Sequence, residues 1–295
     1  MSNYIISCCS TADLNQSYYD EHKIPYACFQ FFVDDVMYED NIGKSMDFAV
    51  FYQKMRDGAM TRTSQVNAES YVDMLRPYLE DGKDVIHITL SSGISGTYNS
   101  ACIAQDMLKE EFPDRTVYVI DSLTGSVGYG LLVETARMKQ AEGMDVHALN
   151  QWLLDNRLKM KLWLMVSDLT YLVRGGRVSK ASGAIGNLLN ICPLIEFDAE
   201  GKLNVREKVR TKKKALKTQL ERMKETAVGG TDYSGKCFIS HSDSLEDAKA
   251  LAAMVEETFP NLNGPVEISN IGTVIGSHTG PGAVVLCYWG DTDNE

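Results

Sequence analysis

The sequence lacks an apolar run long enough to cross a membrane. A membrane-spanning helix needs about 18 consecutive apolar residues, and no segment of the 295-residue chain approaches that length. The first residues also lack the basic region and the long apolar stretch of a signal peptide, because they carry only a very short apolar run around Ile5 and Ile6. We therefore expect the protein to stay in the cytoplasm.

Paired cysteines are missing as well. The chain has seven cysteines, scattered and odd in number, without a C-x-x-C spacing. Such a set argues against a disulfide framework and against a zinc site, and it is typical of a reducing compartment. Free cysteines are among the most buried residue types, so we expect most of the seven in the core. The sequence indicates neither a metal nor another cofactor.

Positive charge is scarce, with 29 Lys and Arg against 40 Asp and Glu and a formal net charge of -11. This balance argues against nucleic acid as a partner, because phosphate binding needs a positive field. One segment is basic, and two interpretations of it stay open: a solvated helix face, or a docking patch for an acidic partner or an anionic membrane surface. Its residues are Arg206, Lys208, Arg210, Lys212, Lys213, Lys214 and Lys217.

The length favours two domains, and the first half predicts a parallel α/β sheet. Short runs of β-forming residues alternate with helical patterns, and such strand–loop–helix units imply right-handed crossovers. The predicted strands are Tyr4–Cys8, Val85–Leu90 and Thr116–Ile120. The predicted helices are Asp47–Arg56, Ala68–Tyr78 with Asn67 as N-cap, Thr97–Lys109, Tyr129–Ala141 and Val146–Leu158.

The pattern changes after Leu158, where strands become more frequent than helices. This indicates a boundary near residue 160, between an N-terminal α/β domain over residues 1–160 and a C-terminal mixed α/β domain over residues 161–295. The predicted strands are Leu162–Val166, Ile191–Phe197, Leu203–Arg210, Lys236–Ser240, Val266–Ile271 and Val284–Trp289. The predicted helices are Lys212–Thr226 and Leu245–Phe259, the second capped by Ser244.

The Ser91–Thr97 loop, S-S-G-I-S-G-T, follows a predicted strand and precedes a predicted helix. Its glycines let the backbone approach a ligand, its hydroxyls donate hydrogen bonds, and the next helix offers unpaired N–H groups. This composition suits a carboxylate or phosphate at the carboxyl end of a strand. The alternative is a plain N-cap with a small-residue turn. The loop has neither the G-x-S-x-G spacing of a nucleophile elbow nor the lysine of a Walker loop.

Four other segments are weak signals when taken singly. Thr61–Gln65 fits a capping sequence before the Ala68 helix, and Arg174–Arg177 marks a tight turn. Gly276–Gly282 places His278 in a glycine-rich loop, where a histidine is often positioned for a ligand. Asp121 is the best acidic candidate, although an Asp at a strand end commonly caps the following turn. No paired carboxylates and no Ser–His–Asp order stand out.

Taken in order along the whole chain, these motifs resemble the DegV family. The matching segments are S-T-A-D-L at residues 10–14, T-S-Q at 63–65, S-S-G-I-S-G-T-Y-N at 91–99, Asp121-Ser122, Y-L-V-R-G-G-R at 171–177 and H-T-G-P-G at 278–282. The resemblance implies two domains with a fatty acid in a deep tunnel between them.

The resemblance also implies roles for particular residues. The carboxylate of a long-chain, palmitate-like fatty acid would be held by Thr63, Ser95 and His278. Supporting residues would be Ser64, Ser92, Gly96, Thr97, Arg177, Arg210 and Gly280. The protein would be a carrier without a catalytic site, presenting the carboxylate to a separate ATP-dependent fatty-acid kinase subunit that makes an acyl-phosphate for phospholipid synthesis. Its partners would be the fatty acid, that kinase and, transiently, a membrane surface.

Three positions depart from the family pattern, and they bear on kinase coupling more than on lipid binding. Cys9 precedes Ser10-Thr11 where the family has Asp, Val66 follows T-S-Q where the family has Pro, and Cys192-Pro193 replaces Lys-Pro. Two other classes of function stay open. One is an enzyme acting on a small anion, with Ser95 as nucleophile or His278 as base, and the other is a regulatory protein without a ligand.

Overall fold

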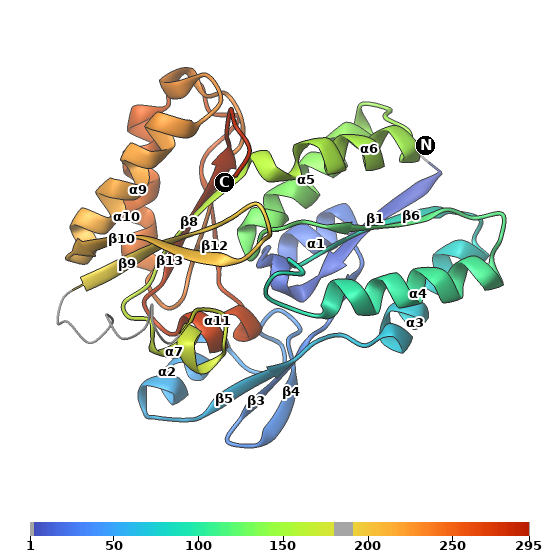
Figure 1. Ribbon diagram of the computed structural model, residues 1–295, viewed down its shortest axis with the longest axis horizontal. Coiled ribbons are helices and arrows are strands. Elements are labelled where there is room, and N and C mark those ends of the chain that lie inside the picture. The colour runs from blue at the N-terminus through green and yellow to red at the C-terminus, as the bar shows by residue number, and fades with distance from the viewer. Residues whose placement is uncertain (1–2, 180–190, 295) are drawn as a thin grey trace.

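The parallel sheet predicted for the first half is confirmed by the computed structural model, which describes residues 3–179 and 191–294. Four strands pair in the order β2-β1-β6-β7, and each neighbouring pair is parallel. The strands are β1 (Tyr4–Cys9), β2 (Tyr26–Ala27), β6 (Asp84–Thr89) and β7 (Val117–Asp121). Both β6 and β7 run into a loop and a helix at the same edge of the sheet (Figure 1).

The five helices predicted for this half begin and end within two residues of the predicted positions, whereas the first helix, Gln16–His22, was not predicted. Asn67 caps its helix as expected, because its side chain accepts a hydrogen bond from the Ser70 amide at 2.8 Å. The helices are α1 (Gln16–His22), α2 (Phe48–Arg56), α3 (Ala68–Glu80), α4 (Thr97–Glu111), α5 (Val127–Ala141) and α6 (Val146–Asn156), with short 3-10 turns η1 (Ser10–Ala12) and η2 (Arg157–Lys159).

The second half forms the mixed sheet that the sequence predicts. Six strands pair in the order β10-β9-β8-β13-β11-β12, and only β11 and β12 are parallel neighbours. The strands are β8 (Met160–Met165), β9 (Ile191–Phe197), β10 (Leu203–Arg210), β11 (Phe238–His241), β12 (Glu267–Asn270) and β13 (Val284–Trp289). The helices are α7 (Thr170–Arg174), α9 (Lys212–Thr226), α10 (Leu245–Thr258) and α11 (Thr273–Thr279), and η3 covers Gly230–Asp232.

Ser244 does not cap α10 in the predicted way. It occupies the N-cap position, but its hydroxyl makes no capping bond. The Ser244 amide instead donates to the ring of His241 at 3.3 Å, and its hydroxyl lies 3.5 Å from the Lys212 ammonium.

A third, three-stranded antiparallel sheet was not predicted. It consists of β4 (Val36–Glu39), β3 (Gln30–Val33) and β5 (Thr61–Ser64), in that order. Asp34 and Asp35 both have positive φ, which is the backbone of a tight two-residue hairpin. The expectation of a capping sequence at Thr61–Gln65 is therefore wrong for its first four residues, which pair with β3 as an edge strand. In Figure 1 this sheet lies below the junction of the two larger sheets.

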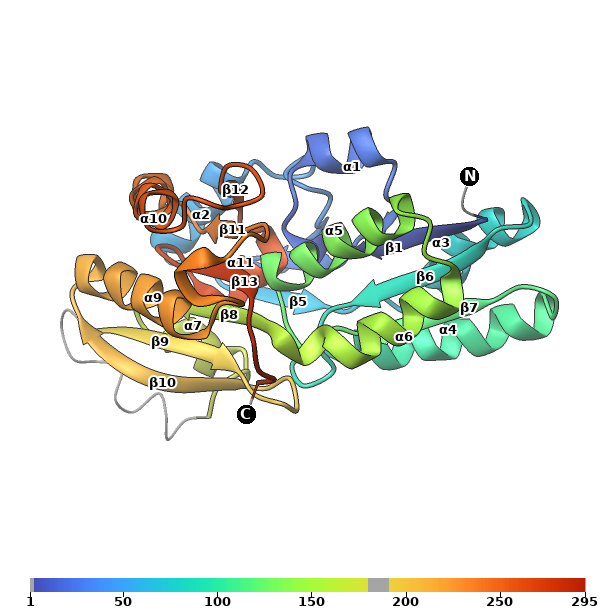
Figure 2. The same cartoon turned by 90° about the horizontal axis from the view of Figure 1, so that it is seen from above.

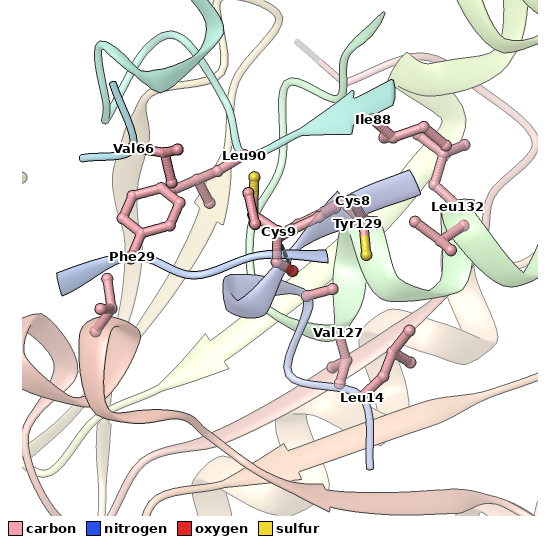
Figure 3. Packing of buried hydrophobic residues seen from close by; sticks show 14 of the residues in the cluster. Cys8, Cys9, Leu14, Phe29, Val66, Ile88, Leu90, Val127, Tyr129 and Leu132 are labelled. Carbon is pink, nitrogen blue, oxygen red and sulfur yellow. Dashed lines mark hydrogen bonds between the residues drawn. The ribbon is translucent and has the colours of Figure 1, made fainter. Parts of the chain in front are cut away.

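Helix α5 joins the two larger sheets, because it packs against β1 and β6 on one side and against β8, β11 and β13 on the other (Figures 1 and 2). Figure 3 shows Tyr129 and Leu132 of α5 beside Cys8 and Cys9 of β1. The larger buried cluster accordingly contains residues of both halves. The division at residue 160 stays a proposal: the sheet type changes between β7 and β8, but the core crosses that point.

Two further expectations can be compared with the structure. Five of the seven cysteines are buried and two are half-buried, so the expectation of core cysteines is confirmed. Within residues 3–179 and 191–294, no helix is both long and apolar enough to span a membrane.

Candidate functional site

A cavity of about 160 Å3 lies between the two halves of the chain. Most of its wall is apolar and comes from the six-stranded sheet, from α11 and from the loop that follows β6. The apolar residues are Phe29, Leu90, Ile94, Leu162, Leu164, Leu172, Phe197, Leu203, Val274, Ile275 and Val285. Four of the residues assigned by the resemblance share this cavity, and we call Thr63, Ser95, Arg177 and His278 the polar cluster.

Thr63 and His278 are in direct contact. The Thr63 hydroxyl lies 2.9 Å from Nε2 of His278, and the two residues come from β5 and α11. The expectation that His278 sits in a flexible glycine-rich loop is wrong, because residues 273–279 form a helix and His278 lies in its last turn. Nδ1 of His278 is buried without a hydrogen-bond partner in the described part of the chain.

Burial keeps the His278 imidazole neutral. Desolvation and, to a smaller extent, the nearby Arg177 guanidinium together lower the pKa of His278 from 6.5 to about 3. At neutral pH the ring therefore offers one N–H donor and one acceptor nitrogen rather than a positive charge.

Arg177 supplies the positive charge of the polar cluster and fixes two of its segments. Its Nε donates to the carbonyl of Ile94 at 3.0 Å, and its Nη1 donates to the carbonyl of Gly175 at 2.6 Å. Ile94 precedes Ser95, and Gly175 packs on the His278 ring. The Arg177 side chain thus ties the Ser91–Thr97 loop to the turn that supports the histidine. The guanidinium has five N–H groups, so donors remain for a ligand anion.

Within the described part of the chain, the Ser95 hydroxyl is bonded only as an acceptor, so its proton is available to a ligand. Its Oγ accepts a hydrogen bond from the Thr97 amide at 3.3 Å, and a hydroxyl has one proton and two lone pairs. The loop that carries Ser95 is anchored across the cavity, because the Ser91 hydroxyl donates to the carbonyl of Gly201 between β9 and β10 at 2.7 Å. Ser95 can therefore donate to an anion in the cavity without losing its own support.

Thr97 and Cys9 belong to a buried network behind the loop. The Tyr71 hydroxyl lies 2.6 Å from Oγ1 of Thr97 and 3.1 Å from Sγ of Cys9, whose sulfur is 3.8 Å from Nε2 of His87. Burial raises the pKa of Cys9 to about 12 and lowers the pKa of His87 to about 3. The Cys–His pair is thus a neutral thiol beside a neutral imidazole, which is not an activated nucleophile.

The other assigned residues are not among those that line the cavity. Ser64 is half-buried at the end of β5, and Gly96 packs against the amide of Gln65. Ser92 is exposed, and its amide donates to Asp121 at 3.0 Å. Gly280, with φ of +73°, lies against the ring of Tyr171, whereas Arg210 is exposed at the end of β10.

The structure shows the role of Asp121 and adds three residues to the cavity wall that were not predicted. Asp121 has a capping role, because the same carboxylate oxygen accepts from the amides of Ser92 and Leu123. Gln65, Ser126 and Thr279 line the cavity but were not among the predicted site residues. Gln65 directly follows Thr63-Ser64, so its place in the T-S-Q motif was the available signal.

Among the residues that the structure describes, no three His, Cys, Asp or Glu side chains gather as a metal site would require.

Comparison with known proteins agrees with this fold. The family model described as "Uncharacterised protein, DegV family" matches residues 6–290. A DegV domain-containing protein of Clostridium perfringens is 35% identical over 99% of both chains. A solved DegV family protein from Thermus thermophilus, whose fatty-acid binding is described, is 27% identical with a TM-score of 0.85, covering 97% of this chain and 99% of that one. DegV of Bacillus subtilis, described as a fatty acid binding protein, is 28% identical with a TM-score of 0.83, covering 99% and 100%. The chain belongs to the DegV family.

Gly175→Ala provides a steric test of the position of His278. Gly175 has φ of −74°, which alanine adopts freely, but its Cβ would lie 2.1 Å from Nδ1 of His278. We expect the imidazole to move, with a loss of about 1–3 kcal/mol of stability and shifted His278 ring resonances in NMR spectra.

The neighbouring Gly176→Ala is the matched control for this test. Gly176 has φ of +72°, so alanine strains the backbone there, but its Cβ would meet nothing within 4 Å. We expect the ring resonances of His278 to stay in place in Gly176→Ala. Equal shifts in both variants would contradict the contact.

The low pKa of His278 predicts a pH effect with a definite sign. The pKa is about 3 in the folded chain against 6.5 for a free imidazole, so the unfolded chain binds more protons below pH 6.5. His278 therefore destabilises the fold progressively as the pH falls from 6.5 towards 3. In an NMR titration its ring should stay neutral at pH 5, and His278→Gln should lose less stability than the wild type between pH 7 and pH 5. A ring that titrates near 6.5 would contradict the burial argument.

Proposed function

We propose that this protein binds a long-chain, palmitate-like fatty acid in the cavity and presents its carboxylate to a separate fatty-acid kinase. The observation that carries the proposal is an apolar cavity whose wall includes the polar cluster: two hydroxyls, a neutral imidazole and one guanidinium. Thr63, Ser95 and His278 would orient the carboxylate, and Arg177 would balance its charge. The protein itself would be a carrier and not an enzyme.

The free energies of burying the acyl chain and of hydrogen-bonding the carboxylate differ in size, so the apolar wall and the polar cluster would have different roles. Removing an acyl chain from water contributes about 0.8 kcal/mol per methylene, so ten methylenes contribute on the order of 8 kcal/mol. A hydrogen bond to a charged group contributes only about 1.5–3 kcal/mol net. The apolar wall would thus supply most of the affinity, and the polar cluster would set the orientation of the head group.

The two solved relatives described above support the ligand class, since both are described as binding fatty acids and both share the fold over nearly the whole chain. The geometry favours the carrier over the enzyme. The Ser95 hydroxyl contacts a backbone amide rather than a base, and Nε2 of His278 is engaged by Thr63. A serine nucleophile needs a base within hydrogen-bond reach of its oxygen.

Extraction of the natively purified protein, followed by mass spectrometry, tests the ligand. We expect a stoichiometric long-chain fatty acid. An empty protein that hydrolyses a generic ester would overturn the proposal in favour of the enzyme, and an empty protein whose melting temperature no fatty acid raises would favour a regulatory role.

Single substitutions test the head-group contacts. Ser95→Ala and Thr63→Ala each remove one hydroxyl, so we expect about tenfold faster release of a fluorescent fatty acid, the size of one hydrogen bond to a charged group. Ser92→Ala is the matched control, because Ser92 lies in the same loop but is exposed and does not line the cavity. Release rates equal to those of Ser92→Ala would refute the assignment.

The basic segment supports a docking role for the start of α9. Lys213 and Lys214 are exposed in the first turn of that helix, where positive charge opposes the helix dipole and does not stabilise the helix. Two other members of the segment are paired within the protein: Arg206 with Glu196, and Lys212 with Asp247 at 2.9 Å. The exposed lysines are therefore better explained by an acidic partner, and we propose the kinase as that partner.

Reversing the charge of Lys213 and Lys214 tests whether the start of α9 docks a partner or is only a solvated helix face. The double variant Lys213→Glu and Lys214→Glu should reduce kinase-dependent acyl-phosphate formation several-fold, while its fatty-acid content stays unchanged. The control is Lys23→Glu with Lys109→Glu, two exposed lysines elsewhere that give the same change in net charge. If both double variants support equal rates, the segment is only a solvated helix face. Vesicle flotation with anionic lipid distinguishes membrane contact from kinase contact.

A further inference from the structure

Two carboxyl groups that the proposed function does not use are buried at the start of α11. Asp13 is 3% exposed and Asp40 is 2% exposed. Both come from the N-terminal half, whereas α11 begins more than 230 residues later at Thr273. Burying a carboxyl group is costly unless hydrogen bonds compensate for the lost water, so each of these residues needs a physical explanation.

Every oxygen of the two carboxyl groups accepts a hydrogen bond. Asp13 accepts from the Gly272 amide at 2.8 Å and, with its other oxygen, from the Ser126 hydroxyl. Asp40 accepts from the Thr273 hydroxyl at 2.7 Å and from the Ser10 hydroxyl at 2.8 Å. Since protein donors occupy all four oxygens, this arrangement favours a structural contact over a site for a cation or another ligand.

The two carboxyl groups converge on the first residues of α11. A Cβ on Gly272 would lie 2.9 Å from one oxygen of Asp13 and 3.3 Å from one oxygen of Asp40. The close approach therefore requires glycine at this position. Asp13 accepts a hydrogen bond from Gly272, the residue before α11, and Asp40 accepts one from Thr273, the first residue of α11. Together the two carboxyl groups fix where the helix begins.

Helix α11 in turn determines one wall of the cavity. Val274, Ile275, His278 and Thr279 all line the cavity and all belong to this single seven-residue helix. Asp13 also bonds Ser126, which lines the cavity with φ of +50° and whose hydroxyl lies 3.0 Å from that of Ser240 in β11. Asp13 thus contacts both Ser126, whose positive φ is unusual for a serine, at the start of α5, and Gly272 at the start of α11.

We infer that Asp13 and Asp40 are positioning residues, which fix the start of α11 and thereby hold the His278 imidazole beside Thr63. Neither residue lines the cavity, so Asp40 acts through α11, and Asp13 acts through α11 and through Ser126. Their effect on fatty-acid binding rests on the proposed function, whereas their effect on the position of the imidazole does not.

The experiment compares Asp13→Ala and Asp40→Ala with the conservative Asp13→Asn and Asp40→Asn. Alanine removes both acceptors. Asparagine keeps one oxygen for Gly272 or Thr273, and its amide can donate to the Ser126 or Ser10 hydroxyl after that hydroxyl rotates. We expect shifted His278 ring resonances and about tenfold faster fatty-acid release in the alanine variants, and near-native values in the asparagine variants.

Glu134→Ala is the matched control. Glu134 is an equally buried carboxylate, 2% exposed, but none of its partners Tyr18, Arg137 and Lys236 belongs to α11. Its loss should lower the melting temperature without moving the His278 resonances. The inference is overturned if folded alanine variants keep native His278 resonances, or if Glu134→Ala shifts them equally.

A second variant covers the case in which the alanine variants do not fold, and the NMR measurement separates this inference from the proposed function. If the alanine variants do not fold, Thr273→Val removes the hydroxyl that Asp40 binds while keeping the side-chain shape, and the same shift of the His278 resonances is expected. Native resonances in that variant would overturn the role of Asp40. A wild-type protein that holds no fatty acid would refute the proposed function only, because the imidazole readout needs no ligand.

Discussion

The hydrogen bond between Thr63 and His278 joins residues 215 positions apart, and the polar cluster depends on it. Each partner is fixed by a different part of the fold. Thr63 lies on β5, an edge strand of the three-stranded sheet that pairs with β3, and His278 lies on α11, which packs against α7, α2 and the same sheet. The polar cluster therefore forms only after the small sheet, α7 and α11 have assembled against one another.

The electrostatics of the cluster follow from its burial. A neutral imidazole adds no charge, so among the described residues that line the cavity Arg177 is the single cation. Burial lowers the pKa of Arg177, and the two carbonyls that it binds carry only partial charges. A guanidinium in such surroundings is stabilised by a full negative charge. A ligand with a carboxylate head and an apolar body satisfies both the cation and the apolar wall at once.

The sequence predicted the long helices and most strands of the two larger sheets, because their periodicity reflects burial on one face, but it missed the short helices α1, α7 and α11. The small sheet was missed because its outer strands lack the alternation of apolar and polar residues that marks a strand with one buried face. Strand β4 is almost entirely exposed, and β5 has the sequence T-R-T-S. The sequence placed His278 in a loop because Gly276 and Gly280 suggest flexibility, although Gly276 packs on the Tyr52 hydroxyl within a helix. Motif order named Thr63, Ser95 and His278 as candidates, and the structure places them at one cavity. It gave no means of separating cavity walls from core, since Leu164 and Phe197 look like core residues in any sequence.

Asp13 and Cys9 show most clearly why some residues cannot be interpreted from sequence. Asp13 follows a short turn and would be taken for a cap, yet its partners Gly272 and Ser126 are remote in the chain. Cys9 replaces a carboxylate of the family pattern, which suggests a lost function. In the fold it contacts Tyr71, whose hydroxyl reaches Thr97 behind the Ser95 loop. A thiol can take part in that network while remaining neutral, so it avoids the cost of burying a charge between Tyr71 and His87. The buried Cys9 thus still contacts the network that supports the Ser95 loop.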